Sequence, residues 1–211
     1  MSVAQRKLET GRTHAERRRE AESRIVHAAF EIVARRGVDQ LTLAEAGEEA
    51  GYSRALPAHY FASREALLAA VAEHAVELYR QRLTERNVAK AAGREAILEA
   101  IAFHIDDSRT WPKRLRAFHE IVNAGLRWPS IAEVVARLNH DSVARLAAQI
   151  EAAQTHGEIA GHIDPQADAV MVTGALRGIM SQWLLAPDSI DLDRARDALT
   201  GGLRRSWTAA K

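Results

Sequence analysis

The chain has 211 residues, of which 47% are hydrophobic and 27% are charged, and its formal net charge is +1. This composition is typical of a globular protein with a substantial core and excludes a disordered chain. It contains no apolar run near the ~20 residues of a membrane span, no signal-peptide core after Met1 and no cysteine, which excludes disulfides and thiolate chemistry. We therefore expect a cytoplasmic protein without a membrane partner.

The first twenty residues are basic. They hold six arginine and lysine side chains against three glutamates, a local net charge of +3. Such an arm can dock on phosphates or enter a minor groove of DNA. A solvated terminus without a partner is an equally good interpretation.

Helical periodicity runs through nearly the whole sequence, so the predicted fold class is all-α. The first helix is expected over residues 15–36, and Gly37 ends it as a left-handed cap. Its apolar stripe consists of Ile25, Ala28, Ala29, Ile32 and Val33.

Residues 42–61 have the pattern of a helix-turn-helix. Thr42 and Glu45 form a predicted capping box for a short helix, and Gly51 supplies the turn. Ser53 is the expected N-cap of the next helix, although Pro57 favours a later start. Gly47 should cost about 1 kcal/mol relative to alanine inside the first of these helices. A helix of this kind places side chains in a DNA major groove.

A long helix capped by Ser63 should run to about Val88, and further helices are expected near 94–108, 113–127, 130–156, 165–186 and 192–207. Trp-Pro pairs mark two of the breaks, and Asp164-Pro165 is a helix start signal. We expect an N-terminal three-helix DNA-binding domain over 15–80 and a C-terminal helical ligand-binding and dimerisation domain over 81–211, which share the long helix.

Residues 19–79 resemble the tetracycline-repressor (TetR) family of bacterial transcription regulators. The matching residues are Ala28-Ala29-Phe30, Gly37, Thr42, Ala50-Gly51, Ser53-Arg54, His59-Tyr60-Phe61, Ser63 and Glu65-Ala66-Leu67-Leu68. The C-terminal half is similar only in its helical layout. Pro57, and Ala58 where a tyrosine is common, depart from the family pattern.

The resemblance implies a homodimer that binds a pseudo-palindromic DNA operator and is controlled by a small-molecule effector of unknown identity. The residues it implies for DNA contact are Thr42, Ser53, Arg54, Ala55, Leu56, His59, Tyr60 and Arg64. Arg54 is the best candidate to read a base, because a guanidinium can bond guanine O6 and N7 together. A phosphate contact is its alternative role, and partial burial is the alternative for Tyr60.

The segment 169–185 is apolar nearly all round, so it must be buried on several sides. With the following helix it is predicted to form a four-helix dimer interface, as the resemblance also implies. The interface candidates are Met171, Gly174, Ala175, Gly178, Leu199 and Leu203. Packing within one chain is the alternative.

An effector pocket is expected among the middle helices, lined by aromatic and polar side chains. Its candidates are His104, Trp111, Phe118, His119, Asn123, Trp128 and His140. Each of them can instead be an ordinary core or surface residue. The histidine spacing and the absence of a completing carboxylate argue against a metal site, and we expect no cofactor.

The leading hypothesis is a sequence-specific DNA-binding transcriptional regulator, a repressor released from its operator by the effector. An enzyme is not expected, because the sequence has no nucleophile elbow, phosphate-binding glycine loop or paired metal ligands. The alternative is a helical dimeric adaptor protein without specific DNA binding.

Overall fold

The computed structural model describes residues 13–85 and 92–208. The regular elements of these residues are all helical, which confirms the all-α fold class. In chain order they are α1 (His14–Arg36), the 3₁₀ turn η1 (Val38–Gln40), α2 (Leu43–Glu49), the 3₁₀ turn η2 (Leu56–His59), α3 (Arg64–Glu85), α4 (Arg94–Ser108), α5 (Pro112–Ala124), α6 (Pro129–Thr155), α7 (Pro165–Leu185) and α8 (Leu192–Ser206). None of the helices in the described ranges is long and apolar enough to cross a membrane.

Local sequence signals explain where most helices begin. The Ser63 hydroxyl accepts from the backbone N–H of Ala66, 3.2 Å away, and Asp164 accepts from the backbone of the first turn of α7, as expected. Both α5 and α6 begin at a proline that follows a tryptophan, because proline tolerates the first helical position. The described part of α3 ends at Glu85, so the predicted extension to Val88 lies outside the described residues.

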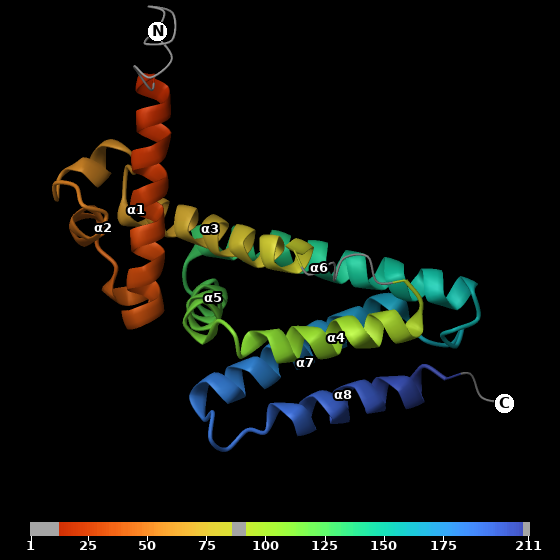
Figure 1. The fold of residues 1–211 in the computed structure, drawn as a ribbon. Coiled ribbons are helices and arrows are strands. Elements are labelled where there is room, and N and C mark those ends of the chain that lie inside the picture. Colours follow the sequence, from red (N-terminus) through yellow and green to blue (C-terminus); the bar gives the residue numbers. More distant parts are fainter. Residues whose placement is uncertain (1–12, 86–91, 209–211) are drawn as a thin grey trace, which may run out of the picture.

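Figure 1 shows α1 standing beside α2, with α3 leaving this end of the molecule alongside α6. Below them α4, α7 and α8 form a second set of long helices, and α5 lies between the two parts. The largest apolar cluster crosses from one part to the other, since it joins Phe30 and Leu67 to Phe118 and Val134. The division at residues 80 and 81 therefore stays a prediction, and the two parts share a core.

Two further apolar clusters hold the C-terminal helices together. One centres on Trp207, whose side chain is fully buried and whose indole N–H donates to Asp168 at 2.5 Å. The other surrounds Ile105 and Met180. These two clusters bury the inner faces of α4, α7 and α8 against one another.

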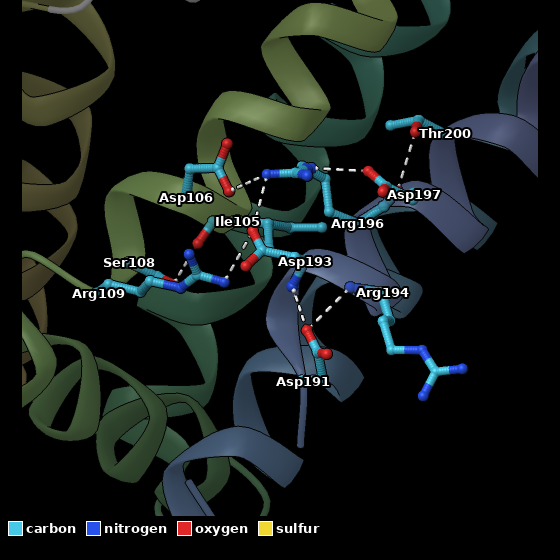
Figure 2. A network of polar contacts seen from close by, with 10 residues as sticks. All are labelled: Ile105, Asp106, Ser108, Arg109, Asp191, Asp193, Arg194, Arg196, Asp197 and Thr200. Atoms are coloured by element: carbon cyan, nitrogen blue, oxygen red, sulfur yellow. Dashed lines mark hydrogen bonds and ion pairs between the residues drawn. The ribbon is translucent and has the colours of Figure 1, made fainter. Parts of the chain in front are cut away.

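A polar network, shown in Figure 2, fastens the start of α8 to the end of α4. Arg196 lies 2.9 Å from Asp106 of α4 and 3.0 Å from both Asp193 and Asp197, while Arg109 lies 3.1 Å from Asp193. The hydrogen bonds that Arg196 donates to Asp197 and Asp106 raise its pKa. Of these ion pairs, only Arg196–Asp106 and Arg109–Asp193 join the two segments, and pairs this exposed contribute little to stability.

Candidate nucleic-acid interface and effector cavity

A close backbone approach shapes the turn between α2 and η2. A Cβ atom on Gly47 would lie 2.7 Å from the Ser53 carbonyl oxygen and 2.9 Å from the Pro57 ring. Gly51 adopts a φ of 79°, which favours glycine. Glycine is less favourable than alanine inside a helix, but a larger residue at position 47 would leave no room for Pro57. Gly47 is therefore required by the packing of the turn.

The exposed helix of this motif is shorter than predicted. It is the single 3₁₀ turn η2, which begins at Leu56, and Ser53 is not its N-cap. The preceding residue is Ala55, and no side-chain cap bond forms. Pro57 opposes a regular helix here, since its nitrogen has no hydrogen to donate and it restricts the residue before it. The buried side chain of Phe61 anchors the end of the turn in the core.

Most of the expected DNA-contact residues are exposed. Thr42, Ser53, Arg54, Ala55 and His59 are exposed, whereas Leu56 and Tyr60 are half-buried and pack against the main core. The Thr42 hydroxyl accepts from the backbone N–H of Glu45 at 3.2 Å. The return bond of the predicted capping box is missing, because the Glu45 carboxylate pairs with Arg36 instead.

Arg54, the candidate base reader, pairs with Glu48 of α2 at 3.0 Å. The two side chains are 71% and 49% exposed. An ion pair this exposed contributes little, about 0–1 kcal/mol. The guanidinium is therefore free to exchange Glu48 for a base or a phosphate.

Arg64 was also expected among the DNA-contact residues, but its side chain is engaged elsewhere. Its guanidinium donates to the carbonyl oxygens of Leu41 and Val38, each at 2.8 Å, and lies 4.8 Å from the centre of the Trp128 ring. Two of its N–H groups are bonded to the backbone and its face packs on an indole, which favours a structural role over a phosphate contact.

A cavity of about 130 Å³ opens among α3, α4, α5, α6 and α7. This volume is well above the ~10–15 Å³ that a single water needs on the same measure. Its lining residues are Tyr79, Ile97, Ala100, Ile101, His104, Leu115, Phe118, His119, Ser142, Arg145, Leu146, Gln149, Val172, Thr173, Leu176, Arg177 and Met180. An apolar wall with a few polar groups is the usual make-up of a small-molecule site.

Aromatic rings form one wall of this cavity. Tyr79 of α3 stacks on Phe118 at 4.9 Å between ring centres, and His104 meets Tyr79 edge-on at 5.8 Å. Burial raises the pKa of Tyr79 to about 12 and lowers the pKa values of His104 and His119 to about 4. All three side chains are therefore neutral near pH 7.

The cavity differs from the predicted one in four of its seven candidates. His104, Phe118 and His119 line it, but Asn123 and His140 are exposed elsewhere. Trp111 belongs to the cluster around Ile105, and Trp128 lies under Arg64. The charge of Arg177, an exception in an otherwise apolar helix, was the sequence signal that could have pointed to this site.

The outer face of α7 is apolar and open. Met171 is 51% exposed, and a Cβ atom added to Gly174 or Gly178 would meet nothing within 4 Å. Leu199 is half-buried against both C-terminal clusters. Leu203, expected at the dimer interface, is instead buried in its own chain beside Trp207, since it lies on the face of α8 that turns inward.

Within residues 13–85 and 92–208, no group of three or more histidine and acidic side chains is placed to hold a metal ion.

Comparison with known proteins places this architecture in a family. Residues 25–71 match the family described as "Bacterial regulatory proteins, tetR family", and residues 91–208 match "BetI-type transcriptional repressor, C-terminal". The chain belongs to the TetR family. As a TetR-family regulator it binds operator DNA, acts as a dimer and responds to a small-molecule effector.

Individual proteins are similar to this chain over most of its length. The chain is 26% identical to the HTH-type transcriptional regulator TtgR of Pseudomonas putida over 84% of this chain and 86% of that protein. A TetR-family regulator from a Rhodococcus species has a similar structure, with a TM-score of 0.74 and 25% identity over 90% of this chain and 99% of its own. A regulator from Saccharomonospora viridis, solved in complex with choline, shares the fold with a TM-score of 0.70 at 19% identity, over 86% of this chain and 94% of its own.

Proposed function

We propose that this TetR-family regulator is a repressor that reads its operator through the surface around η2 and leaves it when the cavity is filled. The observation that carries the proposal is the exposed group of Ser53, Arg54, Ala55 and His59 on a turn fixed by Pro57. A surface this rigid can enter a major groove without a large ordering cost.

Within this surface, Arg54 is assigned to bases and Thr42, Ser53, His59 and Tyr60 to phosphates. Arg54 has a long, exposed side chain with a single weak ion pair, so it can reach into the groove. The guanidinium of Arg18 on α1 lies 5.6 Å from the ring centre of Tyr60, which adds positive charge beside the phosphate contacts.

The dimer is assigned to the open face of α7 with the outward side of α8. Exposed Val170, Met171 and Leu185 on α7 would be covered by a second copy, and Gly174 and Gly178 allow the backbones to approach closely. Two such faces related by a two-fold axis bring two η2 surfaces to one pseudo-palindromic operator.

Effector control is assigned to α3, because it connects the cavity to the turn that precedes α2. Tyr79 lines the cavity near the end of this helix, and Arg64 holds the 38–41 turn at its beginning. An occupant that favours a different position of Tyr79 would therefore favour a different spacing of the two η2 surfaces. The change in operator affinity is limited by the occupant's differential affinity for the two positions.

A regulatory role without catalysis is part of the proposal and is supported by the family assignment. A regulator of a bacterial chromosome is also expected to act in the cytoplasm. The choline complex of the Saccharomonospora viridis relative supports a small organic molecule as the kind of occupant.

The test is selection of binding sites from genomic DNA fragments, followed by the affinity for the selected site across a salt series. We expect a pseudo-palindrome bound at least about 10³-fold more tightly than scrambled DNA, with affinity falling steeply as salt rises. Failure of a folded dimer to enrich any sequence would refute the proposal.

A further inference from the structure

The charges around the cavity are one-sided. No aspartate or glutamate is among its lining residues, whereas Arg145 and Arg177 are. In the described part of the chain, neither arginine has a carboxylate within ion-pair distance. A partly enclosed space with fixed positive charge and no countercharge attracts anions.

Arg177 is the inner of the two charges. Its side chain is half-buried on α7, and one of its nitrogens donates to the amide oxygen of Asn139. A guanidinium has five N–H groups, so this bond leaves several donors available. Burial lowers the pKa of Arg177, because a cation out of water lacks compensation. A negatively charged occupant would supply that compensation.

Neutral polar groups surround this charge. The charge of Arg177 acts on both Tyr79 and His119: it opposes the rise that burial causes in the pKa of Tyr79 and adds to the lowering of the pKa of His119. No hydrogen bond is found for the Tyr79 hydroxyl or for the rings of His104 and His119 within residues 13–85 and 92–208. These groups are therefore free to bond the oxygens of an occupant. The carboxylate of Asp107 opposes the lowering of the His104 pKa, but it already accepts two hydrogen bonds from Arg82, at 2.5 and 2.6 Å.

The rest of the cavity wall consists of apolar side chains, which form no hydrogen bonds. It is formed by Ile97, Ile101, Leu115, Leu146, Val172, Leu176 and Met180. A hydrocarbon chain or a ring would fill this part at the expense of water.

We propose that the effector is an organic carboxylate with an apolar body. The carboxylate bonds the Arg177 guanidinium and the neutral groups beside it, and the body lies between α4, α6 and α7. A planar carboxylate matches the fork of a guanidinium, which favours it over other small anions. The inference rests on the cavity being the effector site proposed above.

The test compares matched ligands that differ only in their head group. Octanoate and 4-phenylbutanoate are each set beside the corresponding primary amide and amine, and binding to the purified full-length dimer is measured by calorimetry. We expect each acid to bind at least about tenfold more tightly than its amide, and the amines to bind most weakly.

Two variants locate the effect. R177Q should reduce the preference for acid over amide to within a few-fold, while R177K, which keeps the charge but not the fork, should retain part of it. R137Q, on the surface of α6 outside the cavity, should behave as the parent protein. Far-ultraviolet circular dichroism of each ligand-free variant checks folding.

The inference is wrong if an amine binds as tightly as its acid, if R177Q keeps the full preference, or if neither acid binds at millimolar concentration. Operator affinity without ligand is measured separately. Specific operator binding that a neutral molecule or an amine releases, and no acid does, would keep the proposed function and overturn this inference. If the protein binds the carboxylic acids but selects no operator, the carboxylate site is kept and the proposed function is overturned.

Discussion

The guanidinium of Arg64 lies 4.8 Å from the centre of the Trp128 ring while it donates to the carbonyl oxygens of Val38 and Leu41. Three segments far apart in the sequence thus meet at one side chain: the turn before α2, the first residue of α3 and the start of α6. Both Arg64 and Trp128 were expected in other roles, one at the DNA and the other in the effector pocket.

Replacing Arg64 by lysine tests this structural role. Lysine keeps the charge but cannot donate to two carbonyls in a fork or stack on an indole. We expect R64K to lower the free energy of unfolding by about 1–3 kcal/mol in urea denaturation. Because no phosphate contact is lost, the slope of operator affinity against salt should not change, and a slope reduced by about one would return Arg64 to the DNA contacts.

Arg54 and Glu48 give a pair of opposite expectations. R54A should weaken binding to the selected operator by about 1–3 kcal/mol and relax preference at one base position. E48Q removes the carboxylate that faces Arg54 at 3.0 Å and should strengthen binding to any DNA sequence. Electrophoretic mobility shifts with specific and scrambled DNA measure both. Equal loss on all sequences in R54A would assign Arg54 to a phosphate instead.

Gly47 lies inside a helix, where alanine is ordinarily favoured. A methyl group here would meet the Ser53 carbonyl oxygen at 2.7 Å, so G47A should destabilise the protein by about 1–3 kcal/mol, against the propensity trend. G202A is the matched control, because Gly202 also lies inside a helix, α8, and a Cβ atom there would meet nothing within 4 Å. Thermal unfolding of both decides the matter, and a stabilised G47A would show that the turn moves away at little cost.

The two buried histidines of the cavity should make the folded protein less stable in acid. Burial lowers the pKa of His104 and His119 to about 4 in the folded protein, against about 6.5 for an exposed histidine. Between these values the unfolded chain binds protons that the folded one does not, so stability falls as the pH is lowered from 6.5 to 4. H119Q should remove part of this loss, about 1–3 kcal/mol, whereas H140Q at an exposed position should not. If the free energy of unfolding falls equally with pH in the parent protein, H119Q and H140Q, the lowered pKa of His119 is refuted.

The α7 face can be tested with a charge. M171D places a carboxylate among exposed apolar residues and should raise the dissociation constant of the dimer by roughly tenfold or more, because the charge would be buried without a partner. L126D changes an even more exposed apolar residue in the turn between α5 and α6 and serves as the control. Sedimentation velocity distinguishes them, and an unaffected M171D would move the interface away from this face.

Helix boundaries were largely predictable from the sequence, because they depend on local chemistry. Pro112, Pro129 and Asp164 mark their helix starts without help from the rest of the fold. The exposed turn was less predictable, since its length depends on how Pro57 packs against Gly47 across the motif.

The cavity shows the limit more clearly. Periodicity tells which face of a helix is apolar, but it does not tell which helices enclose a common space. Tyr79 and Arg177 were missed for this reason, and His140 was included because histidine is common in binding sites although here it is exposed. Leu203 had the spacing of an interface residue and is instead buried beside Trp207.

The 22 residues of α3 contain neither glycine nor proline, and the helix is roughly 33 Å long. A helix without glycine or proline lacks the usual sites of kinking, so it can move as one piece. A tilt of about 4° would move its far end by roughly 2 Å. If an occupant displaces Tyr79, a helix that tilts as one piece would carry that displacement to the other end of α3. A small adjustment inside the cavity would then change the spacing of the two η2 surfaces relative to the pitch of DNA.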